Sequence, residues 1–151
     1  MSNSDKIALH QTCQNLLTDK INTLNRNIKD AQQAASEDTK SSAGDKFETS
    51  REMIKQEIDK QVGLLGKTEK MLSLLTQINP ESKPDQVGLG SLVKTNEGMY
   101  FFSVSLGKVS VEGKPYFVIS LASPIGKELF GKRVGDKLEF MGREILVKGI
   151  W

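Results

Sequence analysis

The first half of the chain carries apolar or small side chains at alternating steps of four and three. The first such run consists of Leu17, Ile21, Leu24, Ile28, Ala31 and Ala35. A second run, with longer steps, consists of Phe47, Ile54, Ile58, Leu65, Leu72 and Leu75. Heptad spacing of this kind places one narrow apolar stripe on a helix. Because a short polar segment at 36–44 separates the two runs, the pattern predicts an antiparallel helical hairpin, a coiled coil over residues 1–79 with its tip near 36–48.

The second half shows short β-type runs separated by turn signals. The expected strands are 91–95, 99–106, 109–111, 116–121, 137–140 and 145–150. One segment, 123–131, reads instead as a short helix, since Ser123 suits the cap, Pro124 the first helical position and Gly131 the exit. Two prolines mark 80–87 as a linker. The sequence therefore predicts the α+β class, with a small antiparallel sheet domain over 88–151 crossed by one helix.

Composition narrows the class of protein. Hydrophobic residues make up 37% and charged residues 26% of the 151 positions, and the net charge is +2. These values are typical of a soluble chain with a modest core. No apolar run approaches the roughly 20 residues that a membrane helix needs. The N-terminus also lacks a basic region followed by an apolar stretch. We therefore expect a cytoplasmic protein with no membrane partner.

The scarcity of nucleophiles limits catalysis. The chain has one cysteine, Cys13, and one histidine, His10, three positions apart. They would share a helix face, but no glycine-rich oxyanion segment lies near them and nothing orients the histidine. The simpler interpretation is that they are packing and surface residues. We therefore expect a chain that is not an enzyme by itself and has no cofactor of its own; an independent small enzyme is the third hypothesis.

Acidic residues gather where the two helices are expected to meet. Four acidic and two basic residues over 37–48 leave a local charge of −2. Asp45 and Glu48 have the spacing of a capping box, in which the first residue caps the helix and the second returns to the backbone. The same carboxylates could bind a divalent cation or a basic partner. Both interpretations stay open, and they are compatible.

Two segments resemble the bacterial transcript-cleavage factors GreA and GreB. The segment Ser123-Pro-Ile-Gly-Lys-Glu-Leu-Phe-Gly-Lys-Arg-Val-Gly-Asp136 is similar to the family's Ser-Pro…Leu-x-Gly…Gly-Asp segment, which introduces its last two strands. Gly44-Asp45-Lys-Phe-Glu48 resembles the Gly-Asp-x-x-Glu at the tip of the family's coiled coil. The order of parts also agrees, with a long hairpin, a linker and a compact domain. The resemblance implies that this last domain is FKBP-like.

The resemblance implies RNA polymerase as the partner, with nucleic acid met only through the transcription complex. The hairpin of the family enters the polymerase secondary channel. Asp45 and Glu48 would there help to hold a Mg²⁺ supplied in the polymerase active site and orient a water that cleaves backtracked RNA. Residues expected to contact the polymerase are Ser123, Pro124, Lys127, Lys132 and Arg133. For the basic residues among them, solvated surface is the alternative interpretation.

Departures from the family pattern leave other functions open. After Glu48 the family has Asn-Ala-Glu-Tyr, whereas this chain has Thr49-Ser-Arg-Glu52. Arg51 places a cation one helical turn from Glu48, where it could pair with that carboxylate. The alternatives are a channel-occupying regulator that does not promote cleavage, and a coiled-coil interaction protein whose seam pairs with another chain. We expect a monomer, because the seams of the two helices can satisfy each other.

Overall fold

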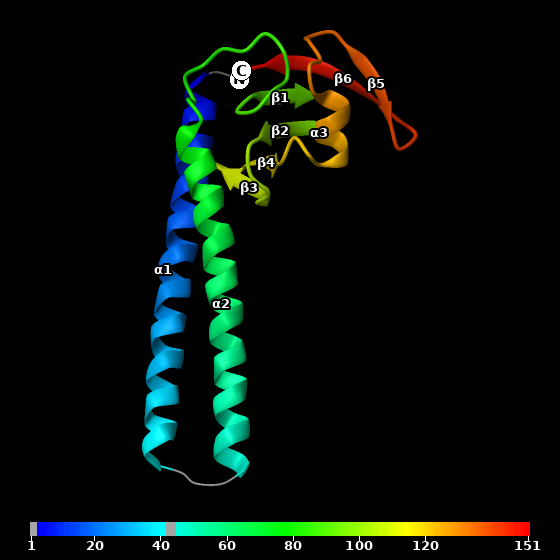
Figure 1. Ribbon diagram of the computed structural model, residues 1–151. Helices are drawn as coiled ribbons and strands as arrows, with labels where there is room; N and C mark the ends of the chain where they lie inside the picture. Colours follow the sequence, from blue (N-terminus) through cyan, green and yellow to red (C-terminus); the bar gives the residue numbers. More distant parts are fainter. Residues whose placement is uncertain (1–2, 42–44) are drawn as a thin grey trace. The chain divides into compact units, whose positions relative to one another are not determined.

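The structure is a computed structural model that describes residues 3–41 and 45–151, with side chains described over 3–37 and 50–151. Two long helices precede six strands and a short helix, which confirms the α+β class (Figure 1). The elements are α1 (Asn3–Ser41), α2 (Asp45–Gln77), β1 (Leu92–Thr95), β2 (Gly98–Phe102), β3 (Gly107–Val111), β4 (Lys114–Ile119), α3 (Pro124–Leu129), β5 (Lys137–Phe140) and β6 (Arg143–Ile150).

The chain forms two compact units. One unit, the sheet unit, joins Met1–Asn15 to Ser73–Trp151. The other, the arm, is Leu16–Leu72. Both long helices therefore run through both units, and their bases belong to the same unit as the sheet. Among the described residues, no helix is long and apolar enough to cross a membrane.

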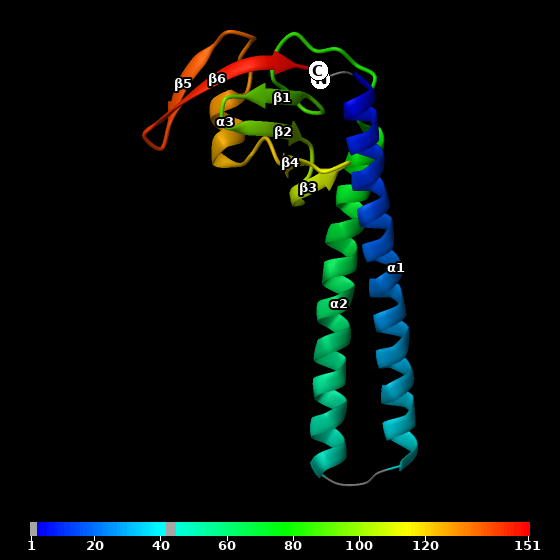
Figure 2. The ribbon, with the colours of Figure 1, turned by 180° about the vertical axis from the view of Figure 1, so that it is seen from behind.

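Within the arm, α1 and α2 run side by side in opposite directions, as the two views show (Figures 1 and 2). Leu17 is fully buried. Between positions 18 and 37, every side chain that is not exposed belongs to the predicted seam. These side chains are Ile21, Leu24, Ile28, Ala31 and Ala35. The apolar stripe of α1 is thus confirmed position by position.

The stripe of α2 contains two polar residues that the sequence pattern skipped. Ile54, Ile58, Leu65 and Leu72 are half-buried as expected. The gaps of seven between the last three are filled by Gln61 and Thr68, which complete the alternation of four and three. Thr68 is fully buried, and its hydroxyl donates to the carbonyl of Leu64 at 2.8 Å. Leu75, the last predicted member of this seam, is fully buried. Phe47, the first, lies outside the described side chains.

The strands form one sheet in the order β3-β4-β2-β1-β6-β5. Neighbouring strands are antiparallel except β2 and β4, which pair in parallel from Tyr100 opposite Phe117 to Phe102 opposite Ile119. The sheet is therefore mixed, whereas the sequence predicted an antiparallel one. The strand β3 follows β2 in the sequence but lies at the edge of the sheet, beyond β4. The next strand, β4, runs antiparallel to β3 and returns beside β2 in the same direction as β2.

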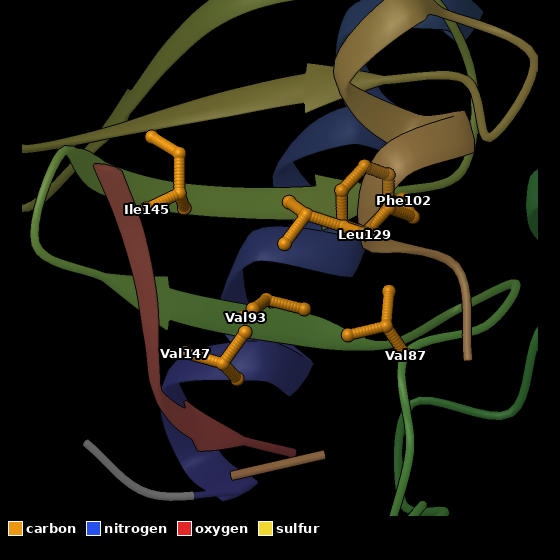
Figure 3. Packing of buried hydrophobic residues seen from close by; sticks show 6 residues of the cluster. All are labelled: Val87, Val93, Phe102, Leu129, Ile145 and Val147. Carbon is orange, nitrogen blue, oxygen red and sulfur yellow. The ribbon is translucent and has the colours of Figure 1, made fainter. Parts of the chain in front are cut away.

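Each face of the sheet has its own apolar layer. Figure 3 shows the layer that includes α3, in which Leu129 of the helix lies among side chains of the strands and of the segment before β1. This cluster consists of Val87, Val93, Phe102, Leu129, Ile145 and Val147. The other face of the sheet carries buried side chains that alternate along the strands with those of the first face. They are Leu92, Phe101, Val109, Tyr116 and Val118. Burying both faces explains how so short a sheet is stable.

Candidate functional site

The segment that resembles the Gre motif is held together by its own polar groups. The hydroxyl of Ser123 accepts from the backbone N–H of Gly126 at 3.1 Å and donates to the carbonyl of Ser120 at 2.6 Å. Pro124 follows as the first residue of α3. Ser123 is therefore the N-cap that the sequence predicted, because its oxygen satisfies a backbone donor that the helix leaves free.

Glycines of this segment are required by the backbone. A Cβ added at Gly126 would lie 2.6 Å from the carbonyl oxygen of Ser120 and 2.7 Å from that of Leu121. Gly131 and Gly135 have φ angles of +78° and +94°, which favour glycine. In the turn that leads from α3 into β5, a carboxylate oxygen of Asp136 accepts from the backbone N–H of Arg133 at 2.8 Å. The motif thus builds a helix, a turn and the entry into β5.

The residues expected to contact a partner lie on or beside α3. Pro124, Lys127 and Arg133 are exposed, whereas Ser123 and Lys132 are half-buried. Arg133 Nη1 lies 3.2 Å from Asp85 Oδ2, and both side chains face solvent. An exposed pair of this kind stabilises a fold very little, so it leaves the guanidinium available to another partner.

Two exposed apolar residues flank these cations, and the sequence reasoning did not single them out. The side chain of Phe130 is 61% exposed and that of Val134 is 59% exposed. With Lys132 and Arg133 between them, they form what we call the exit segment of α3, residues 130–134. A signal was present in the sequence, since Phe-Gly-Lys-Arg-Val lies at the end of the expected helix and its apolar residues lie outside any predicted strand.

The exit segment is anchored by the backbone. The N–H of Gly131 donates to the carbonyl of Val87 and the N–H of Val87 donates to the carbonyl of Lys132, each at 2.8 Å. Val87 is itself buried in the core cluster. The exposed side chains of the segment are therefore presented by a fixed backbone, which lowers the entropy that binding would cost.

The acidic residues predicted at the tip lie at the start of α2. Asp45 is the first residue of that helix and Glu48 is in its first turn. The side chains of both lie outside the described residues, so the capping and metal-binding interpretations both stand as predictions. Arg51 and Glu52, which depart from the family pattern, are exposed. Within the described residues, no group of three or more His, Cys, Asp or Glu side chains could hold a metal ion.

Cys13 and His10 are both buried at the base of α1. His10 Nε2 lies 2.7 Å from the carbonyl oxygen of Leu75 in the last turns of α2, and since a carbonyl only accepts, this nitrogen donates. Burial raises the pKa of the Cys13 thiol to about 12. The thiolate is the nucleophilic form, so Cys13 is inert in the folded chain. The two residues pack the base of the hairpin instead of forming a nucleophile pair.

Lys6 lies one turn before His10 and is fully buried. Its Nζ donates to the carbonyl of Ser82 at 3.1 Å. Burial lowers the pKa of this amine from 10.5 to about 8, because the charged form is poorly solvated there. Lys6 and His10 therefore tie the base of α1 to the end of α2 and the linker that follows it.

Two of the hollows formed by the described residues lie in the sheet unit. The larger, about 570 Å³, is open and is lined by Lys137, Leu138, Glu139, Gly142 and Glu144 of the β5–β6 hairpin. The smaller, about 270 Å³, is lined by Leu74, Gln77, Ile78, Asn79, Ser82 and Leu89. The charged residues of the larger hollow are exposed, and its Lys137 and Glu144 lie 3.7 Å apart.

Among the known proteins compared with this chain, similarity is found to solved structures alone. No protein-family model matches the sequence, and no curated protein matches it. A solved structure described as that of the transcription factor Gfh1 is similar over 91% of this chain and 92% of its own, with 25% sequence identity and a TM-score of 0.37. Backbones with this TM-score do not superpose closely as whole chains, so the likeness carries no argument about fold or function.

Proposed function

We propose that this chain is a Gre-type transcription factor that binds RNA polymerase, inserts its helical hairpin into the secondary channel and modulates cleavage of backtracked RNA. The observation that carries the proposal is the 123–136 segment. It resembles the segment that introduces the last two strands of the family, and here it leads directly into β5 and β6. The capped α3 supports the resemblance because it accounts for the serine, the proline and the glycines by one local structure.

The arm is long and thin, which suits insertion into a narrow channel. Its part of α1, residues 16–41, is about 39 Å long at about 1.5 Å per residue. The chain reverses between α1 and α2 beside Asp45 and Glu48. Carboxylates carried on a long thin support could reach a metal inside a narrow channel. There they would add ligands to a weakly held Mg²⁺ and so lower the pKa of a metal-bound water.

The exit segment supplies a surface for docking the sheet unit. Aromatic and arginine side chains contribute most to protein–protein binding when they enter pockets of the partner. Phe130 and Arg133 provide one of each within a few residues, and Lys132 adds positive charge. This combination fits a partner surface with an apolar pocket rimmed by carboxylates. Polymerase contact through Ser123, Pro124 and Lys127 would extend the same surface along α3.

The tip is tested by RNA cleavage in a stalled, backtracked complex made with the polymerase of the same organism. Wild-type protein is compared with Asp45→Asn and Glu48→Gln, with helicity checked by circular dichroism. We expect faster cleavage with wild type and loss of at least tenfold of that acceleration in each folded variant. No acceleration, but competition with a known secondary-channel factor, would instead identify a channel-occupying regulator.

Docking is tested by affinity for core RNA polymerase. Phe130→Ser is expected to weaken binding by at least tenfold, because it removes the apolar anchor. Met141→Ser is the matched control, since Met141 is 82% exposed and lies outside the exit segment. Equal affinities for wild type and Phe130→Ser would place the contact elsewhere. No binding of wild type at micromolar concentration would refute the proposal itself.

The coiled-coil interaction alternative is less favoured than the monomer, because the seam is covered within one chain. It rested on a seam that another chain could cover, but Leu17 and Leu24 are already 0% and 5% exposed in the single chain. A second chain would have to displace α2 from α1 to reach them. Sedimentation equilibrium decides between the two, with a mass near 16.7 kDa expected for the monomer.

A further inference from the structure

We propose that the arm contains a bending point, which we call the mid-arm hinge, formed by residues 22–27 of α1 and 61–68 of α2. The inference goes beyond the proposed function and does not depend on it, because it concerns the arm alone. It rests on three features of the two helices that lie within about three turns of one another along the arm, at the level of residues 58–68 of α2. Each feature weakens one of the helices or the seam between them.

The first feature is a pair of glycines in the interior of α2. A Cβ added at Gly63 or at Gly66 would meet nothing within 4 Å. Neither glycine has a positive φ angle. Glycine is the least favourable residue for a helix interior after proline, since it leaves the backbone most freedom to lose. Packing and backbone geometry therefore give no reason for glycine here, and both positions would accept alanine.

The second feature is the polar pair in the α2 seam. Gln61 Nε2 donates to Glu57 Oε1 at 2.8 Å, but Gln61 Oε1 is buried and has no hydrogen-bond partner among the described atoms. A buried polar atom without a partner costs stability. Thr68 donates its hydroxyl to the carbonyl of Leu64 one turn earlier. Hydrogen bonds of this type within a helix favour bending.

The third feature is the sequence of α1 opposite this segment. His10 contacts Leu75, so in antiparallel helices residues whose numbers add to about 85 lie at the same level. Residues 22–27 then lie opposite 58–63. This stretch reads Asn-Thr-Leu-Asn-Arg-Asn, in which Leu24 is the one buried side chain. Asparagine and threonine are poor helix formers. The weak stretches of the two helices thus overlap where 22–24 of α1 face 61–63 of α2, and there the arm can bend with the least loss of helix stability.

Hydrogen exchange of the full-length protein tests the hinge. We expect amides of 61–68 to exchange at least tenfold faster than those of 52–57 and 69–75 on either side. The double variant Gly63→Ala/Gly66→Ala should slow exchange within 61–68 by at least tenfold. Ser73→Ala, an exposed substitution in the same helix, is the matched control and should leave 61–68 unchanged. A smooth gradient along wild-type α2, or equal slowing along the whole helix in the double variant, would overturn the proposal.

A distance measurement separates bending from simple local opening. Gln56 and Lys70 are exposed and flank the hinge, and in a straight helix their backbones are about 21 Å apart at about 1.5 Å per residue. Spin labels on Gln56→Cys and Lys70→Cys should give a broad distance distribution that extends below the straight-helix value. The double alanine variant should narrow it. Cys13 is buried and does not interfere. A single narrow distance in the wild-type background would contradict the hinge.

Discussion

Lys6 shows how one buried side chain sets the pH dependence of stability. Its pKa is about 8 in the folded chain and 10.5 in the unfolded chain. Between these values the unfolded chain holds more protons, so the contribution of Lys6 to stability rises with pH in that window. At pH 7 the amine is charged in both states and the burial penalty is fully present. A shift of this size corresponds to about 3 kcal/mol.

We expect Lys6→Met to stabilise the protein at pH 7 by about 1–2 kcal/mol, since methionine fills similar volume without a charge and loses only one hydrogen bond. This advantage should shrink between pH 8 and 10.5, as wild type loses its proton. Cys13, whose pKa is raised from 9.0 to about 12, opposes the trend above pH 9 but is common to both proteins. Urea unfolding at several pH values measures the difference in the free energy of unfolding between Lys6→Met and wild type.

Lys29→Met is the control for this experiment, because Lys29 is exposed on the same helix. It should change stability little and without a trend in pH. A Lys6→Met advantage that stayed constant from pH 7 to pH 10.5 would mean that burial does not shift the titration of Lys6.

Residues at the base of α1 show which side-chain contacts cannot be predicted from the sequence. Ser123 could be predicted as a cap because its role depends on neighbours in sequence. Lys6 and His10 could not, since their partners Ser82 and Leu75 are 76 and 65 positions away and are brought near only by the fold. For Asp45 and Glu48 the sequence does predict a role, but their side chains lie outside the described residues, so that role stays a prediction.

Among the elements, α3 depends on one close backbone approach. We expect Gly126→Ala to destabilise the protein by more than about 2 kcal/mol, because its Cβ would lie well inside contact distance of two carbonyl oxygens. Gly88→Ala is the matched control, since a Cβ there meets nothing within 4 Å and the φ angle is not positive. The control should be neutral or stabilising by up to about 1 kcal/mol. Thermal unfolding compares the two, and equal effects would contradict the close approach.

The predicted strands and short helix are confirmed to within a few residues, because period-two runs and turn residues specify them locally. The two-residue turns at Glu112-Gly113 and Met141-Gly142 have positive φ angles throughout, as hairpins of this length require. The parallel pairing of β2 with β4 could not be predicted in this way. It depends on which strands meet across the sheet, and neither period nor turn type encodes that choice.

For the whole molecule, the division into two compact units predicts two units of unfolding. The base of α1 belongs to the sheet unit although it is continuous with the arm. Stability is not uniform within a fold, and segments that share a core open together. We therefore expect amides of 3–15 to open with the sheet and those of 16–37 to open with the rest of the arm. The distinctive part of this prediction is that α1, one continuous helix, opens in two separate parts, divided between residues 15 and 16.

Two core substitutions test it by native-state hydrogen exchange. Leu24→Ala removes a buried seam residue of the arm and should cost about 2–4 kcal/mol, with faster exchange confined to 16–72. Val147→Ala, in the sheet core, should cost about 2 kcal/mol and speed exchange in the sheet and in 3–15. Leu16→Ala is the control for the arm, because Leu16 is 46% exposed. If each core substitution speeds exchange everywhere, the chain unfolds as one unit. If 3–15 follows Leu24→Ala, the helical hairpin is a unit of its own, and the fold divides at the linker as the sequence predicts.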